Sequence, residues 1–324
     1  MSVGEHSAAA VEPGRTVFVR VPATSANLGP GFDSLGLALS AYDELTVTAL
    51  PAGELDIEVT GSGADEIPRD ASHLIVTTIQ HVFEAFGRTA PGLRLVARNG
   101  VPHGRGLGSS AAAVAAGVLA AAGLLAGDVD LTDEDLLRMA NEVEGHPDNV
   151  APALFGGLTI AWLDENGAPH HKKLLVHRGV APVVFVPETT MSTKTARSVL
   201  GPEVPREDAV FNVSRSALLI AALTQSPDLL LAATEDKLHQ NYRAASMPET
   251  DKLVSALRAA GFAAVVSGAG PSVLVLADGP GRRAEAAELV AQVSDTPWET
   301  LMLAVDFKGG TVRETPVGAA RHDS

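Results

Sequence analysis

A glycine-rich stretch runs directly into an apolar segment in the first third of the chain. Residues 102–112 read Pro-His-Gly-Arg-Gly-Leu-Gly-Ser-Ser-Ala-Ala. Glycine lets a backbone approach a ligand closely, and the start of a helix offers unpaired N–H groups and a partial positive charge. These features suit phosphate groups, and the hydroxyls of Ser109 and Ser110 add ligands for a phosphate oxygen or a metal ion. The stretch therefore predicts a phosphate-binding loop, although an ordinary glycine loop before a capped helix would look similar.

We expect the whole stretch to contribute to nucleotide binding. Its residues are Pro102, His103, Gly104, Arg105, Gly106, Leu107, Gly108, Ser109, Ser110, Ala111 and Ala112. It is not a Walker A loop, because no Lys-Ser or Lys-Thr follows the last glycine. It is not a Rossmann fingerprint either, because Gly104, Gly106 and Gly108 recur at every second residue and no ribose-binding acid follows at the expected distance. A dinucleotide-dependent oxidoreductase is therefore disfavoured.

Two further glycine-containing stretches carry polar side chains. Residues 22–36 read Pro-Ala-Thr-Ser-Ala-Asn-Leu-Gly-Pro-Gly-Phe-Asp-Ser-Leu-Gly, and residues 267–273 read Ser-Gly-Ala-Gly-Pro-Ser-Val. In the first, Thr24, Ser25 and Asn27 follow a predicted strand, where polar groups can converge on a small substrate. Taken alone, the first stretch could be a loop with Asx turns and the second a tight hairpin.

Together, in this order and at these separations, the three stretches resemble the three signature motifs of the GHMP kinases. This family is named for galactokinase, homoserine, mevalonate and phosphomevalonate kinases, and the resemblance covers roughly residues 17–307. It implies an α+β fold with two domains, the first like ribosomal protein S5 and the second ferredoxin-like, with the active site between them. It also implies that ATP and Mg²⁺ are used, that the second motif cradles the triphosphate, and that Gly268 and Gly270 of the third close over the phosphates and the substrate.

Two segments indicate which molecule accepts the phosphoryl group. The first motif, and residues 144–152 (Glu-Gly-His-Pro-Asp-Asn-Val-Ala-Pro) followed by Gly156 and Gly157, resemble the forms in family members that act on homoserine. Mevalonate kinases and galactokinases usually carry a Gly-Glu-His element in the first motif. The resemblance thus implies ATP-dependent phosphorylation of the L-homoserine side-chain hydroxyl, a step of threonine biosynthesis. Two alternatives stay open here: a family kinase for another small alcohol such as mevalonate or a sugar, and a non-catalytic ligand sensor.

The resemblance also assigns residues to the acceptor. Arg197 and Arg243 would clamp its carboxylate, for which guanidinium groups are well suited. Asp33 would pair with its ammonium group, Asn27 would lie near the reacting hydroxyl, and His146 would add a hydrogen bond. The alternative for each arginine is a surface salt bridge, and for the histidine a capping or packing role.

For the metal ion, the expected ligands are Ser110 and Glu144. Glu142 lies two residues earlier, and the sequence alone does not separate the two acids. We expect no dedicated general base, so that Asn27, Thr193 and Arg197 would act by positioning and electrostatics. Asp148, in a region where many relatives carry a candidate base, is expected to be structural.

The composition limits the classes of protein and of partner that are compatible with the sequence. The chain has 324 residues, of which 46% are hydrophobic, contains no cysteine and carries a formal net charge of −15. Cysteine-free chains have no disulfides or thiol nucleophiles, and an acidic surface disfavours nucleic acid as a partner. Residues 111–126 are too short and too rich in small residues for a membrane span, and the N-terminus lacks a secretory pattern. We expect a cytoplasmic protein with no membrane partner, and a homodimer remains open.

Strands and helices interleave along the chain, with hairpin-like stretches, which favours α+β. Strands are expected at residues 17–21, 45–50, 55–59, 93–97, 157–162, 181–186, 263–266, 272–276 and 300–305. Helices are expected at residues 73–86, 109–125, 132–143, 212–223, 228–234, 249–260 and 283–293. The domain boundary is expected between Leu175 and Pro182, giving domains 1–175 and 176–324. Residues up to about Gly14 and from about Gly309 onwards are expected to be mobile.

Overall fold

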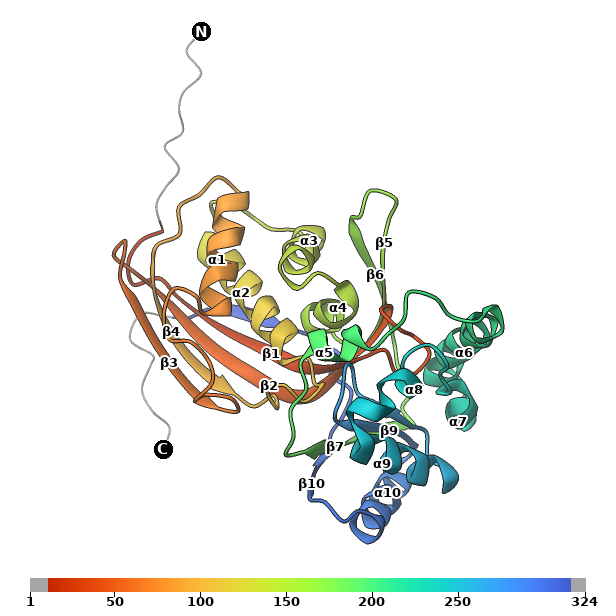
Figure 1. Cartoon of the computed structure of the whole chain (residues 1–324). Helices are drawn as coiled ribbons and strands as arrows, with labels where there is room; N and C mark the ends of the chain where they lie inside the picture. The colour runs from red at the N-terminus through yellow and green to blue at the C-terminus, as the bar shows by residue number, and fades with distance from the viewer. Residues whose placement is uncertain (1–10, 316–324) are drawn as a thin grey trace.

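The computed structural model describes residues 11–315 and contains two β-sheets with helices packed on them (Figure 1). The first sheet runs in the order β11-β1-β2-β4-β3, with β5 pairing with the start of β2, and β6 with β5. Only β3 and β4 are parallel neighbours within it. Its strands are β1 (Thr16–Ala26), β2 (Leu35–Leu50), β3 (Leu55–Gly61), β4 (Gly92–Asn99), β5 (Leu158–Leu163), β6 (Pro169–Leu174) and β11 (Thr311–Thr315).

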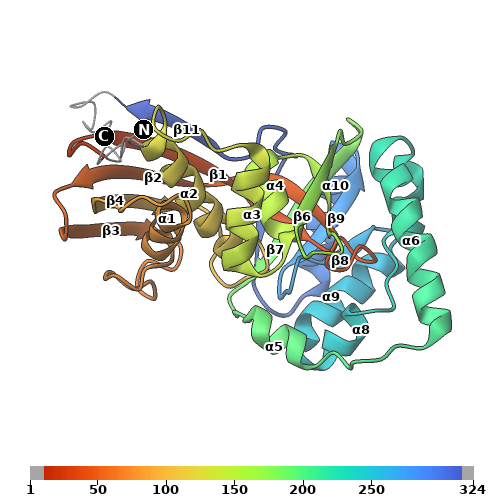
Figure 2. The same cartoon turned by 90° about the horizontal axis from the view of Figure 1, so that it is seen from above.

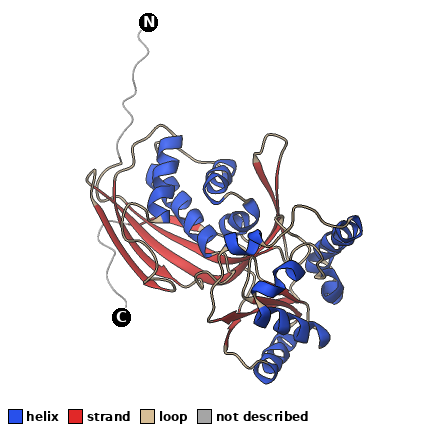
Figure 3. Cartoon of the chain, in the orientation of Figure 1, coloured by secondary structure: helices blue, strands red, loops and turns tan. Residues whose placement is uncertain are grey.

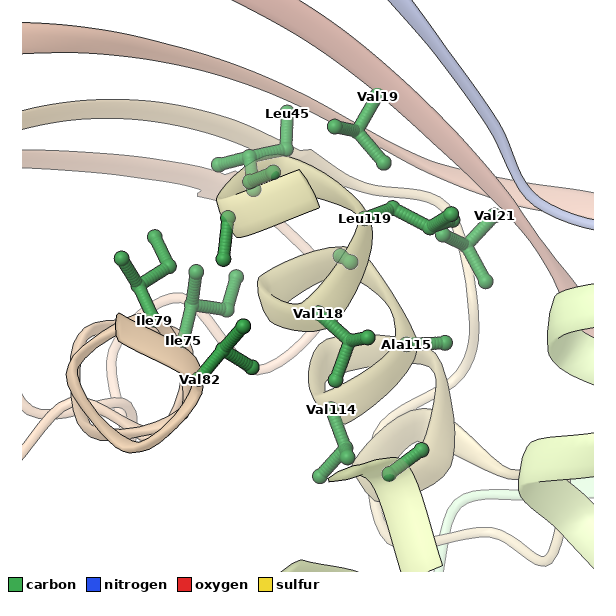
Figure 4. Close-up of a cluster of buried hydrophobic side chains, with 14 of the residues drawn as sticks. Val19, Val21, Leu45, Ile75, Ile79, Val82, Val114, Ala115, Val118 and Leu119 are labelled. Atoms are coloured by element: carbon green, nitrogen blue, oxygen red, sulfur yellow. The ribbon is translucent and has the colours of Figure 1, made fainter. Parts of the chain in front are cut away.

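Four helices cover one face of this sheet (Figure 2). They are α1 (Leu74–Ala85), α2 (Ser109–Leu125), α3 (Asp133–Glu144) and α4 (Pro147–Phe155). Helix α2 is made of small and aliphatic residues and is buried almost all round, so that it lies in the centre of the layer. Valines of β1 meet Ala115 and Leu119 of α2, whose Val114 and Val118 face α1 (Figure 4). Packing of this layer fixes where α2 begins, and therefore where the glycine loop before it lies.

The second sheet is antiparallel and has the order β10-β7-β9-β8. Its strands are β7 (Val180–Pro187), β8 (Ala264–Val266), β9 (Val273–Asp278) and β10 (Trp298–Met302). Helices α9 (Pro248–Ala259) and α10 (Pro280–Val293) cover one face through Leu253, Leu257 and Val290. On the other face, Val184 and Leu274 share an apolar cluster with residues of β2 and of α6 (Arg206–Thr224). This shared cluster holds the two sheets together.

Short helices complete the chain between β7 and α9. They are α5 (Thr193–Ser198), α7 (Leu230–Ala233), α8 (Gln240–Arg243) and two 3₁₀ turns at Pro227–Leu229 and Ala244–Ser246. No helix within residues 11–315 is long and apolar enough to cross a membrane.

The expected α+β class is confirmed, and helices and strands alternate as anticipated (Figure 3). The expectation that the chain is mobile from Gly309 onwards is wrong for residues 311–315, because β11 pairs with β1 and extends the first sheet. Residues 1–10 and 316–324 lie outside the described part of the chain. Helices α4, α5 and α8 and strand β6 were not anticipated. The proposed boundary falls between β6, which ends at Leu174, and β7, which begins at Val180, and stays a prediction.

Candidate active site

The three glycine-containing stretches, remote in the sequence, meet in space. The side-chain amide of Asn27 donates to the carbonyl oxygen of Gly268 at 2.8 Å, which joins the first stretch to the third. The hydroxyl of Ser267 donates to the carbonyl oxygen of Gly106 at 2.7 Å, and its oxygen lies 2.9 Å from the hydroxyl oxygen of Ser25. Hydrogen bonds between buried groups thus fix all three stretches around one site.

Backbone conformation explains why these stretches need glycine. Gly106 and Gly108 have φ values of 76° and 69°, in the left-handed region that disfavours a side chain. A Cβ at Gly106 would collide with the backbone oxygen of Ser267, and one at Gly108 with the hydroxyl of Thr24. These two glycines therefore allow the second stretch to touch both of the others.

The first stretch holds the non-glycine residues with positive φ found among residues 11–315: Asn27 at 69°, Leu28 at 51° and Asp33 at 53°. Such conformations are uncommon and cluster at functional sites. The Oδ1 atom of Asn27 accepts the backbone N–H of Asp33 at 3.0 Å, which stabilises the turn. The turn directs a carboxylate and an amide into the same space.

A cavity of about 210 Å³, here called the central pocket, lies where the three stretches meet. It contains every residue that the sequence assigned to the acceptor and the metal ion. Its lining is Asn27, Asp33, His103, Gly104, Gly106, Gly108, Ser109, Ser110, Glu144, His146, Asp148, Asn149, Met191, Ser192, Thr193, Arg197, Arg243, Gly268, Ala269 and Gly270.

Part of the expected phosphate loop faces away from this pocket. The residues concerned are Pro102, Arg105, Leu107, Ala111 and Ala112. The guanidinium group of Arg105 donates to the carbonyl oxygens of Pro187 and Glu188, each at 2.8 Å, and so anchors the loop to the end of β7. Leu107, Ala111 and Ala112 are fully buried in the apolar clusters. These residues position the loop, whereas His103 and the glycines and serines lie at the pocket.

The start of α2 is open toward a ligand. Its N-cap residue is Gly108, in the left-handed conformation, and no side chain caps the first N–H groups. An uncapped helix start with glycines before it binds anions well. The helix has 17 residues, so its dipole adds to this preference.

Ser110 and Glu144 lie in contact, as expected for a shared metal ion. The Ser110 hydroxyl donates to Oε2 of Glu144 at 2.8 Å, and burial raises the pKa of the Glu144 carboxyl. Glu142 instead faces His81, at 2.9 Å, and Arg138, at 3.2 Å, on the outside of α3. The structure therefore places Glu144 in the pocket and Glu142 outside it.

Within the described residues, no cluster of three or more acidic or histidine side chains could hold a metal ion. Mg²⁺ is usually held by one or two protein oxygens, with waters and substrate phosphates supplying the rest. Burial raises the pKa of Glu144 more than the Ser110 hydrogen bond and the nearby His146 lower it, so a cation bound here would favour the carboxylate form. The Ser110–Glu144 pair therefore fits a divalent cation.

His146 and Asp148 form a second charged pair at the start of α4. Nδ1 of His146 lies 3.3 Å from Oδ1 of Asp148, whose side chain is buried. This contact with Asp148 raises the pKa of His146. Asp148 thus favours a protonated His146 at the edge of the pocket, and its own carboxylate is held in this contact.

Arg197 lines the same pocket and lies on α5. Its guanidinium group forms two hydrogen bonds with the Asp33 carboxylate, and this pairing raises the pKa of Arg197. Thr193 is the first residue of the same helix, after Ser192, whose hydroxyl oxygen caps the helix by accepting the N–H of Thr195. The short helix therefore directs a cation and a hydroxyl into the pocket together.

Arg243, the last residue of α8, is almost fully buried. Its Nε donates to the carbonyl oxygen of Ala196 at 3.0 Å, and one terminal nitrogen lies 3.1 Å from Nδ1 of His239. The ring of Phe32 lies 5.8 Å from the guanidinium carbon of Arg197 and 5.5 Å from that of Arg243. Both expected arginines therefore face one aromatic ring, a typical cation–π arrangement.

An apolar pocket of about 270 Å³ adjoins the central pocket and shares His103, Ser109 and Ser110 with it. No sequence motif indicated this pocket, since its residues come from β2, β4, α1, α2 and the loops that precede the two helices. Its lining is Asp43, Glu44, Leu45, Glu66, Ile67, Pro68, Ser72, His73, Leu74, Ile75, Ala97, Asn99, Val101, His103, Ser109, Ser110, Ala113 and Ala116.

Sequence reasoning also missed Phe32, His239 and Asn149. Asn149 lines the central pocket and accepts the Thr24 hydroxyl at 2.8 Å. Phe32 and Asn149 lie inside two of the quoted motifs, so their motif membership was the available signal. His239 is separated from Arg243 by one helical turn, a spacing that places both side chains on one face.

Two family models match the chain. Residues 73–157 match the N-terminal domain of GHMP kinases, and residues 216–295 match the C-terminal domain.

Known homoserine kinases match the sequence over nearly the whole chain. The sequence is 65% identical to a homoserine kinase of Clavibacter michiganensis, covering 96% of this chain and 98% of that protein. It is 49% identical to a homoserine kinase of Streptomyces coelicolor, covering 91% and 94%. The crystal structure of a homoserine kinase from Cytophaga hutchinsonii is similar with a TM-score of 0.78 at 27% identity, covering 97% of this chain and 100% of that one.

Proposed function

The chain belongs to the GHMP kinase family and acts as a homoserine kinase, and we propose that its central pocket transfers the γ-phosphoryl group of ATP to the side-chain hydroxyl of L-homoserine. One observation carries the assignment of the pocket. Side chains suited to an amino-acid zwitterion, Asp33, Arg197 and Arg243, line the same cavity as the uncapped start of α2 and the Ser110–Glu144 pair. The product, O-phosphohomoserine, is an intermediate of threonine biosynthesis.

ATP spans both pockets in this proposal. The adenosine occupies the apolar pocket, and the triphosphate crosses His103 and Ser109, which both pockets share, to reach the start of α2. Backbone N–H groups and the helix dipole hold the phosphates, which suits a chain with net charge −15. Arg105 contributes by anchoring the loop to the end of β7.

The Ser110 hydroxyl oxygen and the Glu144 carboxylate would hold Mg²⁺. An ion bound there would supply positive charge to offset that of the ATP phosphates during transfer. Glu144 is buried, and burial raises its pKa, so a nearby cation restores its charged form.

Homoserine binds on the other side of the central pocket. Its carboxylate pairs with Arg197 and Arg243, and its ammonium group pairs with Asp33. One side-chain N–H of Asn27 donates to the carbonyl oxygen of Gly268. The other N–H can therefore bind the hydroxyl of homoserine. His146, whose pKa is raised by the contact with Asp148, adds a hydrogen-bond donor at the edge of the site.

Transfer then depends on alignment and on charge. Asn27 holds the acceptor oxygen in line with the γ-phosphorus, while the helix start and Thr193 donate hydrogen bonds to the transferred group. No residue is assigned as a general base: the Asp148 carboxylate lines the pocket but is paired with His146, whose Nδ1 lies 3.3 Å away. The hydroxyl proton leaves to the phosphoryl group or to water as the new bond forms.

The cytoplasm is the proposed location, because the phosphoryl donor is ATP. The proposed small-molecule partners are ATP and homoserine, and a homodimer is compatible with this site because the described chain supplies all of its residues.

An acceptor panel tests this function. ADP release is measured in a coupled assay with ATP and Mg²⁺ and with homoserine, mevalonate or galactose as the acceptor. Homoserine should give the highest kcat/KM by a wide margin. ADP release with mevalonate or galactose and none above background with homoserine would move the chain to another branch of the family.

A further inference from the structure

His239 is a buried histidine one turn before Arg243 to which the reaction described above gives no role. Its side chain has no exposed surface. Nε2 lies 2.8 Å from the carbonyl oxygen of Gly29, and Nδ1 lies 3.1 Å from a terminal nitrogen of Arg243. Both ring nitrogens therefore have a protein partner.

The two partners determine the position of the ring proton. A carbonyl oxygen can only accept a hydrogen bond, so Nε2 must carry the proton that it donates to Gly29. A guanidinium group can only donate, so Nδ1 must be the unprotonated acceptor for Arg243. The ring is therefore neutral, in agreement with burial, which lowers the pKa of His239.

The charged groups around His239 are consistent with a neutral ring protonated at Nε2. The Asp236 carboxylate lies 3.7 Å from Nε2, on the protonated side of the ring, and Arg243 lies on the unprotonated side. Of the other charged groups, Arg243 lowers the pKa of His239, whereas Asp236 and Asp33 raise it. A second proton at Nδ1 would point at the guanidinium group, which has no acceptor.

The histidine is itself firmly held. Asp236 accepts the backbone N–H groups of Leu238, His239 and Gln240 at 2.8–3.1 Å, and these bonds hold the start of α8. The side chain of Asn212 donates to the same carboxylate at 2.8 Å. Phe32 stacks on the imidazole ring with 5.0 Å between the ring centroids. The acceptor nitrogen therefore has a fixed position relative to Arg243.

We propose that His239 is a positioning residue that fixes the guanidinium group of Arg243, through a hydrogen bond accepted at Nδ1, in the orientation that binds the carboxylate of the acceptor. The same terminal nitrogen of Arg243 also donates to the carbonyl oxygen of Gly268, at a longer 3.4 Å, and with the Nε bond to Ala196 two of the three guanidinium nitrogens are restrained. Recognition of the carboxylate then depends on a residue that never touches the substrate. The inference rests on the proposed function, because it assigns Arg243 to the acceptor carboxylate.

Substitutions at His239 test this role by comparing two acceptors. Homoserine carries the carboxylate, and 3-aminopropan-1-ol is the same molecule without it. His239→Leu removes both hydrogen bonds at similar volume and should raise KM for homoserine about tenfold or more, as expected for a lost bond to a charged group. Activity with 3-aminopropan-1-ol and KM for ATP should stay within about threefold of wild type. His239→Gln, whose amide can donate and accept, should recover most of the homoserine affinity.

Two controls separate positioning from general loosening. His171→Leu removes a partly buried histidine that stacks on Phe155 outside both pockets, and it should leave the ratio of the two acceptors unchanged. In an Arg243→Ala background, His239→Leu should cause little further loss with homoserine, because its effect passes through Arg243. Equal losses on both acceptors, or a full additional loss in that background, would overturn the proposal.

A spectroscopic measurement covers the case in which His239→Leu does not fold. The ¹⁵N shifts of the imidazole nitrogens in the wild-type protein, assigned by loss of the signals in His239→Gln, should show a neutral ring protonated at Nε2 near neutral pH. A ring protonated at Nδ1 would overturn the proposal, whatever the kinetic results with homoserine and 3-aminopropan-1-ol. Wild-type activity with homoserine is recorded in parallel, so failure of the proposed function is seen separately.

Discussion

Arg197 and Asp33, which lie 164 residues apart in the sequence, pair with each other at the wall of the central pocket. One terminal nitrogen of Arg197 lies 2.7 Å from Oδ1 of Asp33, and the other lies 3.0 Å from Oδ2. Their side chains are 37% and 39% exposed, so the pair is partly solvated and contributes little to stability. In the proposed binding mode a bound amino acid replaces this contact: its carboxylate takes the place of Asp33 at Arg197, and its ammonium group takes the place of Arg197 at Asp33. The pair therefore supports a zwitterion as the proposed occupant of the pocket.

The first prediction concerns the two arginines. Arg197→Ala and Arg243→Ala should each lower kcat/KM for homoserine by at least about tenfold, because truncating one partner of a shielded charge pair costs about 2–5 kcal/mol. The loss should be larger for Arg243, which is 2% exposed, than for the half-exposed Arg197. Steady-state kinetics with homoserine as the varied substrate measures both.

An acceptor without a carboxylate is the control for the arginines. Wild type should use 3-aminopropan-1-ol poorly, and neither substitution should reduce that activity much further. KM for ATP should change little, since the nucleotide is proposed to bind at the loop before α2. Equal losses on acceptors with and without a carboxylate would assign the arginines to phosphoryl transfer or to folding instead.

The second prediction concerns the metal ion. Glu144→Gln should reduce kcat severely and weaken the dependence of the rate on Mg²⁺, because it removes the negative charge that the ion requires. Glu142→Gln is the matched control, since this acid lies two residues away but bonds to His81 and Arg138. It should retain nearly full activity. A Mg²⁺ titration of both variants gives the answer, and the reverse ranking would transfer the metal ligand to Glu142.

The third prediction concerns the contact between two of the glycine stretches. Gly106→Ala should destabilise the protein and raise KM for ATP, because its Cβ would collide with the backbone of Ser267 at a positive φ. Gly127→Ala is the matched control: this residue also has a positive φ, of 87°, but nothing lies within 4 Å of its Cβ position. It should lose only about 1–2 kcal/mol of unfolding free energy and leave KM for ATP unchanged.

Urea unfolding of the two glycine variants, together with KM for ATP, measures that difference. Gly106→Ala should lose at least about 1 kcal/mol more than Gly127→Ala, because overpacking adds to backbone strain. If both variants behave alike in both measurements, close approach of the loops is not what requires Gly106.

The fourth prediction concerns pH. Burial raises the pKa of Asp43 from its ordinary value of 3.8 to about 6. Folding therefore favours the protonated form, and this contribution to stability is present below pH 3.8 and is lost as the pH rises through about 6. Asp43→Asn cannot ionise. Its stability relative to wild type should rise by about 1–2 kcal/mol between about pH 4 and about pH 7, allowing for partial exposure of the group.

Denaturant unfolding of wild type and Asp43→Asn at several pH values between these limits tests the effect. The difference between the two proteins isolates Asp43 from the other carboxyl groups. A difference that is constant over the range would mean that Asp43 keeps an ordinary pKa in the folded protein.

Much of the site could be predicted from the sequence, because its polar residues lie in a few short stretches. Asn27, Asp33, Ser110 and Glu144 each lie in a quoted motif, and all four line one cavity. The choice between Glu142 and Glu144 was not readable, because it depends on which side of α3 faces the pocket. The partnership of His239 with Arg243 also depends on tertiary packing, since it requires Gly29 on the far side of the ring.

The long elements were predictable and the short ones were not. Helix α2 has 17 residues of a clear type, and the capping box at Thr132 marks the start of α3. Helix α4 contains Pro152 within its span, which argues against a helix in the sequence, and α8 has four residues, too few for a periodic pattern. Strand β11 forms because β1 offers it an edge, which is a property of the sheet.

The most direct test of the account is the phosphorus spectrum of the reaction with homoserine. Wild-type protein with ATP, Mg²⁺ and homoserine should give a ³¹P resonance of a phosphate monoester, split into a triplet by the neighbouring CH₂ protons. The Arg197→Ala/Arg243→Ala double variant, shown to be folded and to bind ATP, should give almost none of it in the same time. A phosphorylated homoserine formed equally fast by the double variant, or none formed by wild type, would contradict the account.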